Sequence, residues 1–150
     1  MNRWFGRLSR LLFVAMFIGQ VVGVAKAIRM KLRVIPTTDP TSDQVVLASI
    51  FGPLDFVSTA ASFRGGALYC LYGGGVLDLR GATLDPGGAI LHIEAFNGGG
   101  QILVPLSWPV RTKVFGLGGV RNARAAMDRP TDGPALTIEG WTMFGGFGIA

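Results

Sequence analysis

The stretch EAFNGGGQILVPLSW, from Glu94 to Trp108, places an aromatic residue and three consecutive glycines before an aliphatic run. Three glycines inside an apolar segment cost conformational entropy on folding, so the structure must need them there. The same phrase recurs as SIFGPLDFV (Ser49 to Val57), CLYGGGVLDLR (Cys70 to Arg80), KVFGLGGVRNA (Lys113 to Ala123) and WTMFGGFGIA (Trp141 to Ala150). The chain therefore contains an imperfect internal repeat.

The spacing of the repeat indicates a stacked architecture. Its anchoring aromatics are Phe51, Tyr72, Phe96, Phe115 and Phe144, separated by 21, 24, 19 and 29 residues. Periods in this range are typical of solenoids, in which one coil cannot bury its own apolar face and several must stack.

The segments between the glycines alternate with the period of a strand. In AILHIEAF, Leu91 and Ile93 fall on one face, while His92 and Glu94 fall on the other. The same period of two is found in VLDLR, VRTKV and ALTIEG. This pattern predicts half-buried strands, and no segment beyond Val45 sustains a helical period.

We therefore predict an all-β, short stacked β-solenoid with glycine corners, preceded by one N-terminal hydrophobic helix. Glycine permits backbone conformations and close approaches that a side chain blocks, and the aromatic beside it is expected to fill the interior and stack on its counterpart one coil away. The alternative is an antiparallel sandwich with glycine-rich hairpins. The predicted structural motif comprises Phe51, Tyr72, Gly73, Gly74, Phe96, Gly98, Gly99, Phe115, Gly118, Gly119, Phe144, Gly145 and Gly146.

The N-terminal segment has the composition of a membrane anchor. Residues 1–33 carry seven basic residues and no acidic residue, and they enclose LLFVAMFIGQVVGVA, from Leu11 to Ala25. Extended to Ile28, this run reaches the length of a short membrane-spanning helix. A signal peptide cleaved after Ala27 and an interfacial helix are the alternatives. Basic residues flank both ends, so charge counting favours neither orientation.

Three segments follow from this pattern: an anchor helix over 1–33, a linker over 34–44 that contains two prolines, and a β domain over 45–150.

The chain has a net charge of +5, but residues 34–150 carry seven basic and nine acidic groups. The positive charge therefore belongs to the anchor. A nucleic-acid-binding domain would carry positive charge on its own surface, so nucleic acid is not an expected partner.

The sequence offers no complete catalytic set. The single histidine, His92, has Glu94 as its only nearby ligand type, and the single cysteine, Cys70, lies in a strand-like run as a small core residue. GLGGVR, from Gly116 to Arg121, lacks the third glycine of the dinucleotide fingerprint. Asp55, Asp78 and Asp85 are interpreted as turn and surface groups. We expect no enzyme activity, cofactor, metal or small-molecule substrate.

Four motifs together resemble the C-terminal domain of the LiaF-like, cell-wall-active antibiotics response family of bacteria. They are YGGGVLDLRGATLD (Tyr72 to Asp85), FNGGGQILVPLSW (Phe96 to Trp108), VFGLGGV (Val114 to Val120) and MFGGFGI (Met143 to Ile149). The resemblance implies a stacked β domain on the cytoplasmic side of the cell membrane and a regulatory link to a sensor kinase system. The founding pattern places several spans before this domain, whereas this chain has one candidate.

These observations favour a membrane-anchored interaction module of the cell-envelope stress response, with a self-assembling structural solenoid as the alternative. The expected partners are the membrane and either another protein or a second copy. The final coil, Leu136 to Ile149, is unusually apolar for a chain end. We expect it to present an open edge, with Phe144 inward and Trp141 or Phe147 at an interface.

Overall fold

The computed structural model describes residues 2–124 and 133–150, and side chains from Gly6 onward. The chain divides into two compact units, Met1–Arg33 and Val34–Ala150. The first is a single helix, α1 (Asn2–Arg33), which is long and apolar enough to cross a membrane. The sequence DRPTDGPA, from Asp128 to Ala135, also predicts a turn, and its residues up to Asp132 lie outside the described residues.

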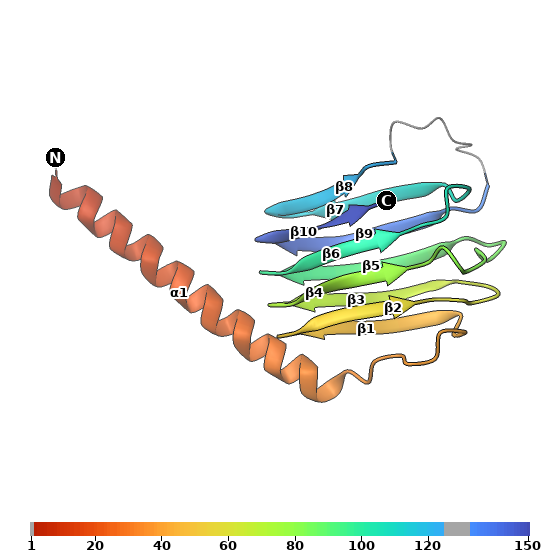
Figure 1. The fold of residues 1–150 in the computed structure, drawn as a ribbon. Helices are drawn as coiled ribbons and strands as arrows, with labels where there is room; N and C mark the ends of the chain where they lie inside the picture. Colours follow the sequence, from red (N-terminus) through yellow and green to blue (C-terminus); the bar gives the residue numbers. More distant parts are fainter. Residues whose placement is uncertain (1, 125–132) are drawn as a thin grey trace. The chain divides into compact units, whose positions relative to one another are not determined.

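The second unit is a β-solenoid built from ten described strands (Figure 1). In chain order they are β1 (Gln44–Ile50), β2 (Pro53–Val57), β3 (Gly65–Leu71), β4 (Gly74–Asp78), β5 (Ala89–Phe96), β6 (Gly99–Leu103), β7 (Val110–Phe115), β8 (Gly118–Asn122), β9 (Leu136–Met143) and β10 (Gly145–Ile149). All strand pairs are parallel, which confirms the solenoid and excludes the antiparallel sandwich.

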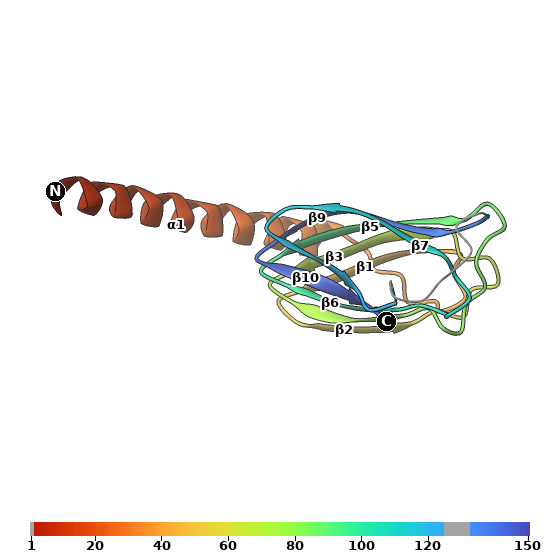
Figure 2. The same ribbon diagram turned by 90° about the horizontal axis from the view of Figure 1, so that it is seen from above.

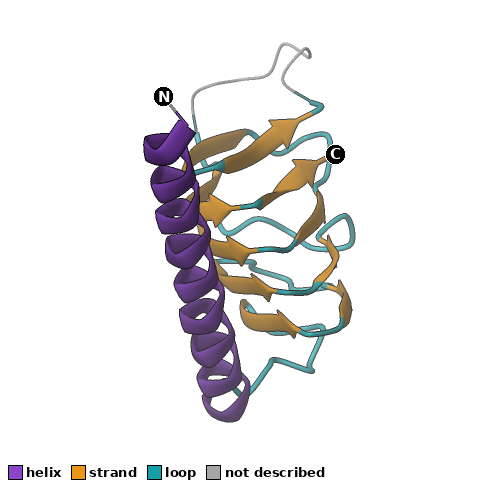
Figure 3. Cartoon of the chain, turned by 90° about the vertical axis from the view of Figure 1, so that its left-hand side faces the viewer, coloured by secondary structure: helices purple, strands orange, loops and turns teal. Residues whose placement is uncertain are grey.

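Consecutive strands form rungs, and each rung contributes one strand to each of two facing sheets. One sheet has the order β1-β3-β5-β9-β7, and the other has the order β2-β4-β6-β10-β8. Figure 2 shows the two layers from above, and Figure 3 shows the rungs stacked along one axis. The last rung in the chain, β9–β10, therefore lies inside the stack, and β7–β8 forms its end.

The core lies between the two sheets and consists mainly of aliphatic side chains. The predicted inward residues Leu91, Ile93, Leu136 and Ile138 are fully buried. Burial alternates along β5 and β9, as the period of two predicted. Apolar burial of this kind is the main stabilising contribution in such a stack.

The glycine corners bring neighbouring rungs into close backbone contact. A Cβ atom on Gly99 would lie 1.9 Å from the carbonyl oxygen of Gly146 on the adjacent rung. No side chain fits at that separation, so the corner requires glycine. Ser49 is buried at the first corner, where its hydroxyl donates to the carbonyls of Gly52 and Gly74.

Four of the repeat aromatics contact one another along the stack, Phe51 and Tyr72 face to face and the other two pairs edge to face, but these rings lie outside the core. Ring centroids are 5.4 Å apart for Phe51 and Tyr72, 5.6 Å for Tyr72 and Phe96, and 6.1 Å for Phe96 and Phe144. Phe51 is 46% exposed and Phe144 is 52% exposed, so the expectation that these rings fill the interior is wrong.

Backbone geometry explains their position. Phe51, Tyr72 and Phe144 adopt left-handed φ values of 55°, 54° and 55° at the corner, and the backbone N–H of each donates to a carbonyl of the adjacent rung. The aliphatic residues of the sheets already fill the space between the layers, which leaves the rings on the outside of the bend. In the β5–β6 rung, Asn97 takes this conformation, with φ 48°, and Phe96 precedes it.

The segment expected as a linker is attached to the β unit. The backbone N–H of Thr37 donates to the carbonyl of Val46 at 2.7 Å, and its hydroxyl accepts from the N–H of Val46 at 2.9 Å. Thr59 N–H donates to the carbonyl of Pro40, and Arg64 N–H donates to that of Asp43. Residues 34–43 therefore cover part of the first rung.

Candidate interaction surface

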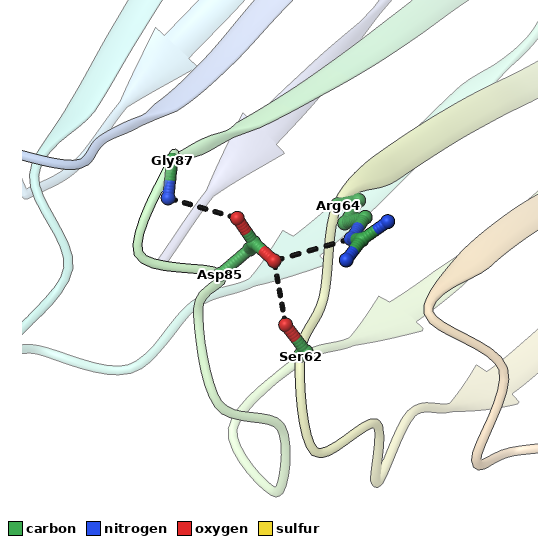
Figure 4. Close-up of polar contacts among 4 residues, drawn as sticks. All are labelled: Ser62, Arg64, Asp85 and Gly87. Atoms are coloured by element: carbon green, nitrogen blue, oxygen red, sulfur yellow. Dashed lines mark hydrogen bonds and ion pairs between the residues drawn. The ribbon is translucent and has the colours of Figure 1, made fainter.

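The polar clusters of the described residues support the turns of the fold. Asp85 accepts hydrogen bonds from the Ser62 hydroxyl at 2.6 Å, the Arg64 Nε at 3.1 Å and the Gly87 N–H at 2.8 Å (Figure 4). These hydrogen bonds lower the pKa of Asp85 below its ordinary value, and the bond from Ser62 makes the largest contribution. The carboxylate thereby ties the β4–β5 turn to the segment before β3, in agreement with its interpretation as a turn group.

Two other pairs of polar side chains involve the outer face of a strand. Arg80 Nε and Nη2 donate to the two carboxylate oxygens of Asp78, at 3.0 and 2.7 Å, and lower the pKa of that carboxyl. His92 Nε2 lies 3.5 Å from Glu94 Oε1 on β5. Within residues 2–124 and 133–150, no group of three His, Cys, Asp or Glu side chains is placed to hold a metal ion.

Cys70 is a buried residue of β3, as predicted. It is 1% exposed, and burial raises the pKa of its thiol to about 12. The thiolate form needed for nucleophilic chemistry is therefore disfavoured.

A shallow trough of about 590 Å³ crosses the beginning of β1, β3, β5 and β9. Backbone atoms and small residues such as Gly66, Gly88 and Ala135 form much of its lining. Arg64 lies at the trough and is held by Asp85. The other polar side chains of the lining are those of Gln44, Arg111 and Thr137.

Among the described strands and corners of the solenoid, the end rung β7–β8 carries the two most exposed large apolar side chains. Phe115 is 72% exposed and Leu117 is 66% exposed. Among the described residues, β7 pairs only with β9, and β8 pairs only with β10. Unpaired strand edges beside apolar side chains are a template for binding another chain. We call this rung, residues 110–122, the open end.

Of the two residues predicted at an interface on the final coil, Phe147 is buried, and Trp141 stays a prediction. Phe147 is 3% exposed because β10 lies between β6 and β8, and its side chain belongs to the core. Trp141 is partly buried on β9, where it lies opposite Glu94 on one side and Phe115 on the other. Phe144, expected inward, is exposed at the corner.

The structure brings the predicted corner glycines of neighbouring rungs together. Gly74 pairs with Gly99, Gly99 with Gly146, and Gly146 with Gly119. Gly73, Gly98, Gly118 and Gly145 precede them at the same corner. Phe115 lies on the end strand and is not part of the three ring contacts described above.

Sequence reasoning missed the open end, although one signal was present. The inward positions of β7 are Val110, Thr112 and Val114, whereas those of β9 include Leu136 and Ile138. The inward side chains of β7 are therefore smaller than Leu136 and Ile138, and one of the three is polar, which indicates a strand with less apolar surface to bury.

No protein-family model, curated protein or solved structure matches this chain.

Proposed function

We propose that this protein is a non-enzymatic, membrane-anchored module that acts through contacts between its β-solenoid and another protein. The open end carries the proposal, because among the described residues it combines two unpaired strand edges with the exposed side chains of Phe115 and Leu117. Contiguous exposed apolar surface on a folded unit is typical of protein–protein contact sites.

The cellular setting of the proposal rests on the glycine motifs. Their resemblance to the LiaF-like domain supports a role in the bacterial cell-envelope stress response, with a component of a sensor kinase system as the partner. Helix α1 supports attachment to the cell membrane, and the resemblance favours a cytoplasmic β-solenoid. The solenoid would then be presented at the membrane surface, where such a kinase system operates.

A pair of exposed substitutions tests the open end as the functional surface. Leu117→Asp alters the open end, whereas Ile90→Asp alters another exposed apolar residue, on β5 in the middle of the stack. Each variant replaces the native gene, and survival under a cell-wall-active antibiotic is measured. We expect Leu117→Asp to behave like the gene deletion and Ile90→Asp to behave like wild type. Equal phenotypes for the two variants would contradict the proposal.

Attachment to the membrane is tested separately. Full-length protein should stay with membranes after a carbonate wash, and removal of residues 2–33 should release it. Release of the full-length chain would exclude a span, and a mature N-terminus at Ile28 would establish signal cleavage instead.

A further inference from the structure

The two ends of the solenoid carry opposite charge. Residues 34–57, which lead into and form the first rung, contain Asp39, Asp43 and Asp55 and no basic residue. The open end, residues 110–122, contains Arg111, Lys113 and Arg121 and no acidic residue. Between these ends, the β3–β4 rung leads into the Arg80–Asp78 pair, whereas the strands of the β5–β6 and β9–β10 rungs carry Glu94 and Glu139 and no lysine or arginine.

Exposed apolar residues also gather at these two ends. The large apolar side chains of the described strands and corners that are more than a third exposed include Val46, Phe51 and Val57 on the first rung, and Phe115 and Leu117 at the open end. The interior rungs contribute Ile90, Leu106 and Phe144. Each end thus offers an apolar surface together with a charge that the other end complements.

The register of the stack aligns the two ends residue by residue. Along the second sheet, Asp55 pairs with Val76, Val76 with Gln101, Gln101 with Gly148, and Gly148 with Arg121. A second copy that continued the stack in the same register would place its Asp55 beside Arg121 on the outer face. On the inner face, Leu54 would lie beside Val120. Opposite charges in directly paired positions stabilise a sheet.

The backbone groups at the two edges agree with this register. The backbone N–H of Ser58 donates to the backbone carbonyl of Asp78 across the β2–β4 pair. The backbone N–H of Ala123 donates to the backbone carbonyl of Ile149 across the β8–β10 pair. Backbone groups alternate sides along a strand, so those of Asp55 face away from β4, and those of Val120 and Asn122 face away from β10. In a parallel pair, the N–H and carbonyl of Asp55 would then bond the carbonyl of Val120 and the N–H of Asn122.

The position of Thr37 indicates which of the two sheets can pair with a second copy. Thr37 makes two hydrogen bonds to Val46 on the outer edge of β1, so that edge is occupied at Val46 and cannot pair there with another strand. The outer edge of β2 begins with Pro53, which lacks an N–H, but Asp55 and Val57 follow it. The β2 edge is therefore the one that another chain can join.

We propose that copies of this chain associate head to tail, with the β8 edge of one copy pairing in parallel with the β2 edge of the next and with Arg121 beside Asp55. This inference rests on the proposed function in that both use the open end as a contact surface, and it names a second copy as the partner. The contact is heterologous, so it leaves one free end of each kind and extends into open chains.

Cysteine cross-linking tests the register in the full-length protein in detergent micelles. One preparation carries Asp55→Cys, and a second carries Arg121→Cys, while Cys70 stays buried in both. Mild oxidation of the mixture should give a disulfide-linked dimer, and either preparation alone should give at least tenfold less. Gln101→Cys, in the same column but inside the stack, replaces Arg121→Cys as the control. A mixture no more cross-linked than this control would overturn the register.

Charge reversal tests the energetics by sedimentation velocity of the full-length chain. Arg121→Glu and Asp55→Arg should each weaken association about tenfold, because a cross-strand attraction becomes a repulsion. The double variant in one chain should restore association, since the charges at positions 55 and 121 are then exchanged and again attract each other across the contact. A monomeric wild-type protein, or an association that neither reversal changes, would refute the head-to-tail contact.

The outcomes separate this inference from the proposed function. A monomer in which Leu117→Asp still abolishes antibiotic survival contradicts self-association and leaves a different protein as the partner. Head-to-tail cross-linking together with full antibiotic survival of Leu117→Asp supports the assembly and contradicts the regulatory role.

Discussion

The last two rungs in the chain have opposite environments. Strand β9 alternates between buried and partly buried residues along its whole length, whereas β7 is exposed at Arg111, Thr112, Lys113 and Phe115. The difference arises because β9–β10 has a rung on each side, and β7–β8 has one only on one side. Position in the stack, and not position in the chain, decides which repeat is buried.

The residues of the two rungs match these environments. The inner rung contributes Leu136, Ile138 and Ile149, which are fully buried. The connection before it, residues 123–135, is longer than the connection of residues 104–109 before β7. In the first sheet, β9 lies between β5 and β7, and in the second sheet β10 lies between β6 and β8.

The largest expected contrast between the two rungs is at their aromatic residues. Phe147→Ala should lower the free energy of unfolding by about 3–5 kcal/mol, because it leaves a cavity in the core. Phe115→Ala, at an exposed position, should change it by no more than about 0.5 kcal/mol. Chemical denaturation of the full-length chain in micelles, followed by circular dichroism, measures both. Similar losses for the two variants would contradict the interior position of β9–β10.

The glycines give the next contrast, between two residues that are register partners. A Cβ atom on Gly146 would lie 2.3 Å from the carbonyl oxygen of Gly119, while one on Gly119 would meet nothing within 4 Å. Gly146→Ala should therefore cost about 1–3 kcal/mol of overpacking. Gly119→Ala should be neutral within about 0.5 kcal/mol. Melting temperatures of the two variants decide this, and an equal drop would show that both corners are enclosed.

The fold was predictable because its signals are local. Alternation in AILHIEAF and the repeated glycines predicted strands, corners and stacking, and the parallel sheets confirm them. The order of the rungs was not predictable in this way, since a repeat carries the same pattern wherever it is inserted. The interval of 29 residues between Phe115 and Phe144 is the longest in the series. It was the spacing that indicated that the rungs do not stack in chain order.

The position of the aromatic rings was missed for a different reason. Hydrophobicity predicts burial for a residue on a flat strand, where alternate side chains enter the core. Phe51, Tyr72 and Phe144 lie instead at left-handed corner positions, which a sequence pattern does not distinguish from strand ends. Prediction of the interface on Phe147 failed because it assumed that the end of the chain is the end of the stack.

Hydrogen exchange should separate the two rungs by a smaller amount. Amides of β10, bonded between β6 and β8, should exchange only through large-scale opening of the solenoid. The amides of Val120 and Asn122 face the open edge and should exchange at least tenfold faster in dilute protein. Exchange read by mass spectrometry at two protein concentrations sharpens the comparison, because head-to-tail association would protect these two amides selectively. Uniform protection of β8 and β10 in the dilute sample would contradict the open edge.

The smallest expected effect concerns two threonines of β9 and β7. Thr142 is fully buried, and its hydroxyl has no hydrogen-bond partner among the described residues, whereas Ser49, in the same column of the stack, donates to backbone carbonyls. A buried unsatisfied hydroxyl is destabilising, and valine has nearly the same shape. Thr142→Val should therefore raise the free energy of unfolding by up to about 1 kcal/mol. Thr112→Val, at an exposed position of β7, should change it by less than about 0.5 kcal/mol. Denaturation midpoints measured side by side test the pair, and a destabilised Thr142→Val would show that the hydroxyl has a partner and that the inner rung depends on it.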